Sequence, residues 1–412
     1  MSILTFDYTQ TLYTPEYLSR FASTAADADS ALKDAGYEYT GWLDYPLTIP
    51  QETLLDIMNT AEEIKRKCDS LVVIGIGGSY LGAKAGISMF SDAFNPKEGC
   101  PEVYFAGWNM SAVYHAQIMK KLKNREVCLI VVSKSGTTLE TTAAFKLFRY
   151  FLFEKYGNDY VKRIYAVTDE KSGELRREAD KAGYKTMVLP GDIGGRYSLF
   201  TPAGLLPLAC GGADVLSVIK GARRAYEDIS TLPFERNAAH QYAVLRRLME
   251  IKGKSVEVYG YWDFQLEYFT EWLKQLFGES EGKQGKGLLP ASAMFPRDLH
   301  SLGQFLQQGN PIVFETMLSV ENPTLDIAYE GGKSSYDKTA KIIEKAVSAA
   351  HSSENTPVMN FVLRDLSEET FGYTSYFFMR ACAVSCVLLG VNPFDQPGVE
   401  AYKAKVKELL GK

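Results

Sequence analysis

The sequence predicts an α/β protein made of two tandem doubly wound domains, each with a parallel sheet covered by helices. Three observations lead to this prediction. The chain has 412 residues, which at roughly 100–200 residues per domain suggests two domains. Short apolar runs typical of buried strands alternate with longer helix-like stretches, which indicates βαβ units. Glycine-rich or hydroxyl-rich segments follow several of these runs, where sheets of this kind bind their ligands.

Composition and charge exclude several classes of protein. Forty-six per cent of the residues are hydrophobic and 23% are charged, as in an ordinary globular protein. With 45 Lys and Arg against 50 Asp and Glu, the formal charge is −5, so we expect no nucleic-acid partner. The apolar run 381–391 is shorter than the ~20 residues that span a bilayer. The first residues lack the pattern of a secretion signal, so we expect neither membrane insertion nor export.

The six cysteines indicate a reducing compartment, and we therefore expect a cytoplasmic protein. No two of them form a C-x-x-C pair, and Cys382 and Cys386 lie one helical turn apart in an apolar run. Such residues are expected to be buried core thiols. None of the four histidines lies four residues from another and no metal-binding triad is visible, so we predict no metal site.

The first domain is predicted over residues 65–195, after a helical N-terminal segment, 1–64, that is expected to pack on the second domain. Leu54, Leu55, Ile57 and Met58 give this segment one apolar face. A strand-like run then begins at residue 71 and breaks into glycines at residue 75. Further strands are expected at 103–106, 127–132 and 164–167, and helices at 112–122 and 139–153.

The second domain is predicted over residues 196–412, because the alternation of strand-like and helix-like stretches changes after the segment 189–195. Strands are expected at 255–261, 311–318 and 357–363. Residues 331–336 form a turn signal before a helix at 338–350. The long apolar stretch 368–389 predicts a buried helix.

The segment 75–79 has the features of an anion site. Gly75-Ile-Gly-Gly78-Ser79 follows a strand and opens a helix, so backbone N–H groups and a positive helix end point at one spot. A dinucleotide-binding motif needs glycine where Tyr80 stands, and a P-loop needs lysine where Ala83 stands, so both nucleotide motifs fail. Taken alone, this segment is equally compatible with a tight strand–helix turn that binds nothing.

The segment 133–138, Ser-Lys-Ser-Gly-Thr-Thr, also follows a strand and precedes a helix. It offers four hydroxyls, one ammonium and a glycine, whereas a helix cap needs only one Ser or Thr. Several donors at a positive helix end suit a phosphate monoester.

Near the predicted domain boundary, Arg196 follows two glycines and presents a rigid cationic fork, either to a ligand or to an interdomain ion pair.

Five side chains in the second half are candidates for proton transfer or substrate contact. Glu279 and Glu281 are expected in a loop after an aromatic helix, 268–277, as a candidate general base or as solvated surface. His300 suits proton transfer between oxygens, or a structural role near a helix start. Lys403 lies about two turns from Gln396 and is expected to face the same cleft, or else the solvent.

The order of six segments along the chain carries a family resemblance. They are GIGGSYLG (75–82), SKSGTT (133–138), GGRYSLFTPAGLLP (194–207), GESEGKQGKG (278–287), DLHSLGQ (298–304) and FDQPGVEAYK (394–403). With these segments the sequence resembles the bacterial glucose-6-phosphate isomerases from about residue 71 to 403. SKSGTT is shared with sugar isomerase (SIS) domains in general, whereas GGRYS and QPGVE-x-x-K are specific to this family.

The resemblance implies two SIS domains, a homodimer, no metal, no cofactor, and reversible conversion of glucose 6-phosphate to fructose 6-phosphate in glycolysis and gluconeogenesis. By motif position, Glu279 rather than Glu281 is the expected base that moves a proton between C2 and C1. His300, supplied by the other subunit, and Lys403 are expected to open the sugar ring. Arg196 is expected to stabilise the cis-enediolate. The expected substrate contacts are Gly78, Ser79, Ser133, Lys134, Ser135, Thr138, Gln275 and Gln396.

Three other functions compete with this interpretation. A regulatory sugar-phosphate sensor would keep SKSGTT but would not need Glu279, His300 and Lys403 together. An isomerase of broader range would also accept mannose 6-phosphate, because discrimination at C2 depends on contacts that the sequence does not locate. A nucleotide-dependent enzyme is disfavoured by the failed glycine spacings.

Overall fold

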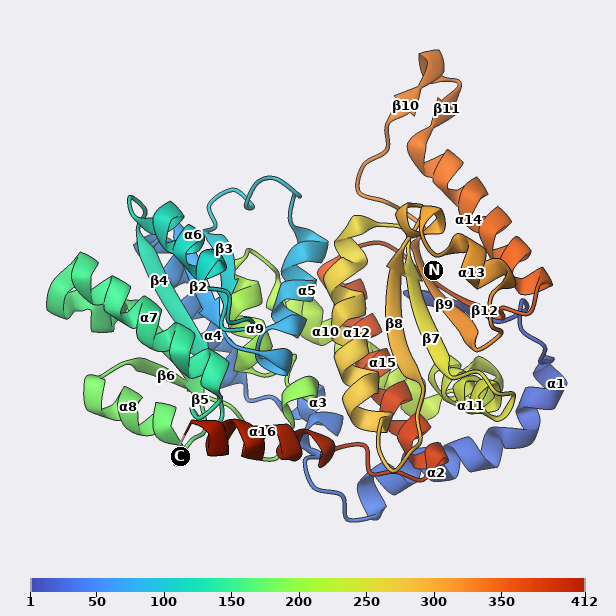
Figure 1. The fold of residues 1–412 in the computed structure, drawn as a ribbon, viewed down its shortest axis with the longest axis horizontal. Coiled ribbons are helices and arrows are strands. Elements are labelled where there is room, and N and C mark those ends of the chain that lie inside the picture. The colour runs from blue at the N-terminus through green and yellow to red at the C-terminus, as the bar shows by residue number, and fades with distance from the viewer. Residues whose placement is uncertain (1, 411–412) are drawn as a thin grey trace. The chain divides into compact units, whose positions relative to one another are not determined.

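The computed structural model describes residues 2–410, which fold into two compact units (Figure 1). The first unit comprises residues 41–220, and the second comprises residues 1–40 together with 221–412. These units begin and end at other residues than the predicted domains 1–64, 65–195 and 196–412. The boundaries differ at two places, because residues 41–64 of the predicted N-terminal segment and residues 196–220 of the predicted second domain both fold with the first unit.

The first unit is built on a five-stranded parallel sheet in the order β3–β2–β4–β5–β6. Four strands lie where the pattern predicts them, and the short strand β6 is an addition at one edge. The order reverses between the neighbours β2 and β4, which creates the switch point where such sheets bind ligands beyond the carboxyl ends of their strands. The strands are β2 (Ser70–Ile74), β3 (Glu102–Ala106), β4 (Val127–Val132), β5 (Ile164–Thr168) and β6 (Lys185–Val188).

Helices cover this sheet because its strands are apolar on both sides. One core joins β2, β4 and β5 to three amphipathic helices, α6, α7 and α8. On α4 the apolar face is formed by Leu54, Ile57, Ala61 and Ile64, whereas Leu55 is exposed, so the predicted face is wrong at that position. The helices of this unit are α3 (Tyr45–Thr48), α4 (Gln51–Lys67), α5 (Leu81–Phe90), α6 (Ala112–Leu122), α7 (Leu139–Tyr156), α8 (Glu174–Ala182) and α9 (Pro202–Cys210).

The second unit repeats the order of four parallel strands, but its fifth strand is antiparallel. Its sheet has the order β1–β12–β9–β7–β8, in which β1 is an antiparallel edge strand and the other strands are parallel. The order reverses between β7 and β9. The α/β fold class is therefore confirmed, although the sequence pattern does not predict β1 and β8. The strands are β1 (Leu4–Asp7), β7 (Val256–Tyr261), β8 (Leu289–Met294), β9 (Val313–Val320) and β12 (Val358–Leu363).

The central helix of the second unit is α15 (Glu368–Leu389). It is long and apolar enough to cross a membrane by length and composition, but 89% of its most apolar window is buried inside the protein. Cys382 and Cys386 are both fully buried there, which confirms them as core residues. The other helices of this unit are α1 (Pro15–Leu18), α2 (Ala22–Asp34), α10 (Val215–Thr231, from residue 221 on), α11 (Ala238–Ile251), α12 (Glu267–Glu281), α13 (Gly303–Gln308), α14 (Tyr336–Ser353) and α16 (Gly398–Leu409).

Two details of the second unit differ from the sequence prediction. The turn predicted at 331–336 belongs to a small hairpin of β10 (Ala328–Tyr329) and β11 (Ser334–Ser335), after which α14 begins two residues earlier than expected. The helix α12 continues to residue 281, so Glu279 and Glu281 lie in its last turn and not in a loop. A helical backbone fixes the directions of these two carboxylates more tightly than a loop would.

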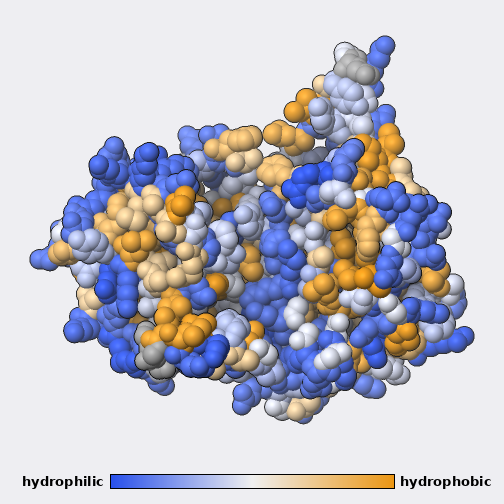
Figure 2. All heavy atoms as spheres, viewed as in Figure 1, coloured by the Kyte–Doolittle hydropathy of each residue, from blue (hydrophilic) through white to orange (hydrophobic). Residues whose placement is uncertain are grey.

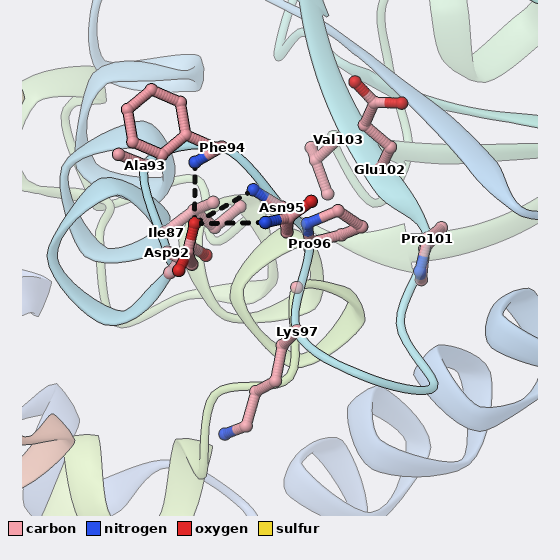
Figure 3. Close-up of a pocket in the computed structure, with 12 residues that line it drawn as sticks. Ile87, Asp92, Ala93, Phe94, Asn95, Pro96, Lys97, Pro101, Glu102 and Val103 are labelled. Atoms are coloured by element: carbon pink, nitrogen blue, oxygen red, sulfur yellow. Dashed lines mark hydrogen bonds between the residues drawn. The ribbon is translucent and has the colours of Figure 1, made fainter.

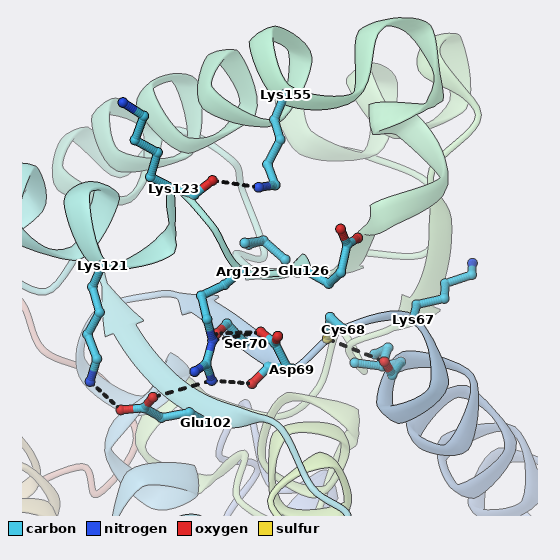
Figure 4. A network of polar contacts seen from close by, with 12 residues as sticks. Lys67, Cys68, Asp69, Ser70, Glu102, Lys121, Lys123, Arg125, Glu126 and Lys155 are labelled. Atoms are coloured by element: carbon cyan, nitrogen blue, oxygen red, sulfur yellow. Dashed lines mark hydrogen bonds and ion pairs between the residues drawn. The ribbon is translucent and has the colours of Figure 1, made fainter.

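Hydrogen bonds and ion pairs connect the strands of the first unit at their amino ends. Arg125 donates to Asp69 at 2.9 Å, and Lys121 pairs with Glu102 at 2.5 Å (Figure 4). Ser70, the first residue of β2, accepts a further bond from Arg125. These groups lie at the ends of β2 and β3 opposite to the loops where ligands are expected, so we assign them to stability.

Apolar side chains on the outer surface are scattered. On the face shown in Figure 2, orange apolar residues form small patches among blue polar ones. Such a mixture is normal for a folded protein, in which more than half of the accessible surface is contributed by apolar atoms.

Candidate active site

The loop after β2 is built from glycines because the backbone turns sharply there. Gly77 has a φ of +58°, a left-handed conformation that glycine adopts without strain. A Cβ atom on Gly75 would lie 2.9 Å from the Cβ of Ser79, so a larger residue would block the 3-10 turn Gly77–Ser79. The helix α5 begins two residues after this turn. The half-buried Ser79 is thereby placed between the carboxyl end of β2 and the N-terminus of a helix.

The loop after β4 is held in shape by its own hydroxyls. Ser133 accepts a bond from the backbone N–H of Gly136 at 3.0 Å, and Ser135 accepts one from the N–H of Thr137 at 3.2 Å. Gly136 has a φ of +73°, and a Cβ there would lie 2.3 Å from the backbone N of Leu175. The loop is therefore preorganised, with the exposed Ser135 at its tip.

The side chains of Thr138 and Lys134 differ in their hydrogen bonds within this loop. Thr138 immediately precedes α7, but its side chain makes no capping bond, so its hydroxyl is not used to close the helix. The ammonium of Lys134 donates to the carbonyl of Gly191 at 2.5 Å. Burial lowers the pKa of Lys134 below its ordinary value. Lys134 thus ties the loop to the segment 189–193, a role that the sequence pattern does not predict.

Arg196 lies beside the glycine loop. A Cβ on Gly78 would be 1.9 Å from the carbonyl oxygen of Gly195 and 2.7 Å from the backbone N of Arg196, so these backbones touch because Gly78 has no side chain. Arg196 is only 4% exposed, and its guanidinium carbon is 5.5 Å from the ring centroid of Tyr197. The Tyr197 ring in turn stacks on Trp42.

The first unit therefore brings three predicted segments together at the carboxyl edge of its sheet. The loops after β2 and β4 adjoin because these strands are hydrogen-bonded neighbours, and the segment 194–198 contacts the first of them. Hydroxyls, helix N-termini and a guanidinium at one edge suit an anion such as phosphate. The predicted residues that gather here are Gly78, Ser79, Ser133, Lys134, Ser135, Thr138 and Arg196.

In the second unit, α12 carries a pair of predicted residues one helical turn apart. Gln275 donates from Nε2 to Oε1 of Glu279 at 3.3 Å. The other amide atom, Gln275 Oε1, is buried and has no hydrogen-bond partner among residues 2–410. A buried acceptor of this kind requires a donor from a ligand or water. Glu279 and Gln275 are both half-buried and form one polar face of the helix.

Glu281 has a different environment, although it lies only two residues from Glu279. It is 2% exposed and pairs with Arg246 at 2.9 Å, and Arg246 also pairs with Glu257 at 2.9 Å. Burial raises the pKa of Glu281, although the neighbouring Arg246 opposes that shift. Tyr242 donates a short bond to Glu257 in the same network. Glu281 is thus committed to a structural ion network, and Arg246, which has no motif around it, is missed by sequence reasoning.

Lys283 connects the end of α12 to the segment that carries Gln396. Its ammonium donates to the carbonyl oxygens of Asn392 and Asp395, both at 2.6 Å, and its side chain is only 7% exposed. The exposed Gln396 therefore follows directly on an anchored residue. Lys283 lies within a segment that supports the family resemblance, and it adds an anchoring function that the sequence pattern does not predict.

His300 and Lys403 are both exposed. His300 closes the 3-10 turn Arg297–His300, after the edge strand β8, and Asp298 fixes this turn by accepting from the N–H of Met294 at 2.8 Å. Lys403 lies on α16 and pairs with Glu400 at 2.7 Å. Within residues 2–410 of this single chain, His300 and Lys403 share no hydrogen bond with each other.

Two further features bear on possible ligands. Residues 2–410 contain no group of three His, Cys, Asp or Glu side chains placed to hold a metal ion. A cavity of about 210 Å³ lies under the loop between α5 and β3. There Asp92 accepts from the N–H groups of Phe94 and Asn95 (Figure 3). None of its lining residues belongs to the predicted site.

Two comparisons with known proteins find the same family. The family model described as phosphoglucose isomerase matches residues 59–287. A glucose-6-phosphate isomerase from Bacillus cereus is 43% identical over 431 aligned positions, which cover 99% of this chain and 96% of that protein.

Solved structures share the fold. A hypothetical protein from Thermus thermophilus matches with a TM-score of 0.91 and 29% identity, covering 99% of this chain and 100% of that one. A glucose-6-phosphate isomerase from Chlamydia trachomatis matches with a TM-score of 0.87 and 22% identity, covering 99% of this chain and 88% of that one. The similarity therefore extends over nearly the whole length in both sequence and fold.

Proposed function

The chain belongs to the phosphoglucose isomerase family and interconverts glucose 6-phosphate and fructose 6-phosphate in glycolysis and gluconeogenesis, and we propose that Glu279 is the base of this reaction. A proton next to a carbonyl is weakly acidic, so a carboxylate has to be held against it. Glu279 takes the proton from C2 of the open-chain aldose and returns it to C1 of the enediolate. The observation that favours Glu279 over Glu281 is that Arg246 and burial occupy Glu281, whereas Glu279 adjoins Gln275 on a half-buried face.

The phosphate of the substrate is held by the first unit in this proposal. Ser79, Ser135 and Thr138 donate to the phosphate oxygens, and Ser133 and Lys134 keep the loop in place. The backbone N–H groups at the starts of α5 and α7 add positive ends of two helices. The phosphate does not react, so these contacts supply binding energy that orients the sugar.

Arg196 stabilises the enediolate in this proposal. Negative charge develops on the sugar oxygens when the proton leaves C2. A guanidinium that is already desolvated favours that charge without further reorganisation. The close approach of Gly78 to Gly195 supports this role, because it places the Arg196 backbone beside the turn that carries Ser79.

Ring opening is assigned to His300 and Lys403, with Gln275 and Gln396 as further sugar contacts. Opening the ring requires a proton to leave O1 and another to reach the ring oxygen. Histidine suits such a transfer near neutral pH. We further propose a homodimer in which His300 reaches the partner subunit's site. Its exposed position after an edge strand supports this arrangement.

The burial of five of the six cysteines supports a cytoplasmic location.

The base is tested with Glu279→Gln, which keeps the size of the side chain and removes its basicity. We expect kcat to fall by about 10²–10⁴-fold while KM stays within a few-fold. Glu271→Gln is the matched control, because this carboxylate lies on the same helix and pairs with Lys274 on its surface. Turnover is followed from fructose 6-phosphate in EDTA by a coupled dehydrogenase, with mannose 6-phosphate as a second substrate. A Glu279→Gln enzyme with most of its turnover would refute the assignment.

The exchange of His300 between subunits is tested by mixing two inactive variants. His300→Ala and Glu279→Gln are mixed in equal amounts and allowed to exchange subunits. Each heterodimer then contains one site with both intact residues, so about a quarter of the wild-type activity is expected if His300 acts across the interface. No recovery, with exchange demonstrated by differently tagged subunits, would contradict the arrangement.

A further inference from the structure

A cavity of about 590 Å³ opens in the second unit, apart from every proposed catalytic residue. It is lined by parts of β1, α10, α11 and α15. This volume falls within the range of small-molecule sites, roughly 300–1,000 Å³. Leu4, Phe6 and Phe377 supply an apolar side, against which carbon atoms of a ligand can pack.

The N-terminus of α11 faces this cavity. Asn237 caps the helix by accepting from the N–H of His240 at 3.2 Å, and it donates to the carbonyl of Ile229 at 2.8 Å. The N–H groups of Ala238 and Ala239, which also line the cavity, have no acceptor inside the helix. Since α11 has 14 residues, its first turn carries the positive end of a full helix dipole.

Two arginines add positive charge to the same cavity. Arg224 projects from α10 and Arg236 precedes α11, and both are exposed at its rim. Neither guanidinium forms an ion pair with a carboxylate of residues 2–410. Two guanidiniums beside a helix N-terminus are a suitable arrangement for a phosphate group.

Gln241 is an independent sign that a ligand belongs here. It is only 7% exposed and lines the cavity, yet its side-chain amide makes no hydrogen bond with any other group of residues 2–410. Its amide atoms are not among the fully buried, unpaired polar atoms of the described residues, so they are open to the cavity and available to a ligand. A ligand with hydroxyl groups would give it both a donor and an acceptor.

The carboxylates of the cavity narrow the class of ligand. Asp228 accepts from the hydroxyl of Tyr373 at 2.9 Å, and Glu235 accepts from the hydroxyl of Ser19 at 3.4 Å. Each carboxylate keeps further acceptor positions for ligand hydroxyls. The cavity thus offers both cationic groups and carboxylate acceptors. We propose that it binds a phosphorylated polyhydroxy compound, with the phosphate between Arg224, Arg236 and the start of α11, and the hydroxyls toward Asp228 and Gln241.

The proposal is tested by counting binding sites with glucitol 6-phosphate, a phosphorylated hexitol that has no carbonyl and so cannot isomerise. Isothermal titration of the full-length protein is expected to give two equivalents per chain. Arg224→Gln with Arg236→Gln should remove one equivalent, and Ser135→Ala with Thr138→Val should remove the other. Arg223→Gln, the neighbouring arginine outside the cavity lining, should keep both.

Two outcomes would overturn the proposal. One is a single equivalent in the wild-type protein that the Ser135 and Thr138 substitutions abolish. The other is a folded Arg224 and Arg236 double variant that keeps both equivalents. If that double variant does not fold, Gln241→Met tests the same cavity. It keeps the side-chain volume and should weaken the second equivalent about tenfold. An unchanged affinity would refute the role of this cavity.

Discussion

Two glutamates in one turn of α12 show how the environment assigns different roles to the same side chain. Glu281 is buried in an ion network with Arg246 and Glu257, where removal of one partner would leave an uncompensated charge. Glu279 projects from the same turn beside Gln275. The network fixes the end of the helix, and the proposed base gains a defined direction from it. No local pattern distinguishes the two residues, because burial depends on α11 and β7, which are distant along the chain.

A single glycine contact offers a test of the proposed phosphate loop. A Cβ on Gly78 would lie 1.9 Å from the Gly195 carbonyl oxygen, whereas a Cβ on Gly195 would meet nothing within 4 Å. Gly78→Ala is therefore expected to lower the free energy of unfolding by about 1–3 kcal/mol and to raise KM. Gly195→Ala, on the other side of the same contact, should leave stability nearly unchanged. Urea unfolding of both variants measures the difference, and equal stabilities would contradict the contact.

At the scale of elements, a partly buried carboxylate ties α2 to α15. Asp29 on α2 accepts from Arg380 of α15 at 2.8 Å and lies 3.6 Å from Nε2 of His240 on α11. Burial alone would raise the pKa of Asp29, but His240 and Arg380 outweigh burial and lower it to about 2, from an ordinary 3.8. This group therefore contributes stability above about pH 4, and the contribution is lost as the pH falls toward 2.

The predicted consequence is a pH-dependent difference between wild type and Asp29→Asn. Near pH 7 the variant should be less stable by about 3–5 kcal/mol, because Arg380 stays buried without its partner. The difference should shrink by about 2 kcal/mol as the pH falls from 4 to 2. Asp27→Asn, an exposed carboxylate on the same helix, should stay within about 0.5 kcal/mol of wild type. Chemical unfolding at several pH values checks this, and a constant difference would refute it.

The elements that can be predicted from sequence are those with a strong local pattern. The strands β2, β4 and β5 are continuous apolar runs, and each is confirmed within one or two residues. The edge strands β1, β6 and β8 escape prediction, because their residues are partly exposed and their pairing comes from distant neighbours. The pattern ends α12 too early because Gly278 is a weak helix former, whereas the helix continues through this glycine to Glu281.

At the scale of the whole molecule, the two sheets have the same reversal of strand order, but only the first carries the loops with hydroxyls and glycines after its central strands. Motif order along the chain predicts the family, and the comparisons confirm it. The alternatives of a non-catalytic sensor and of a nucleotide-dependent enzyme do not agree with that membership. The range of epimers accepted is not encoded in any motif, because it depends on contacts of C2 that only a bound sugar defines.

The division of the chain into units leads to a last prediction. The first unit is continuous in sequence, so a fragment of residues 41–214, cut in the loop before α10, is expected to fold alone. It contains the loops after β2 and β4, and should bind inorganic phosphate. It lacks Glu279, His300 and Lys403, and should not isomerise fructose 6-phosphate.

Phosphate binding by this fragment is measured by phosphorus NMR, with Ser135→Ala and Thr138→Val together as the control that should abolish it. A folded fragment that does not bind phosphate would contradict the assignment of these loops. Turnover by the fragment would instead contradict the position of the base on α12. Binding without turnover would follow from the separation of the two functions between the units, with the anchoring of phosphate in one and the proton transfer in the other.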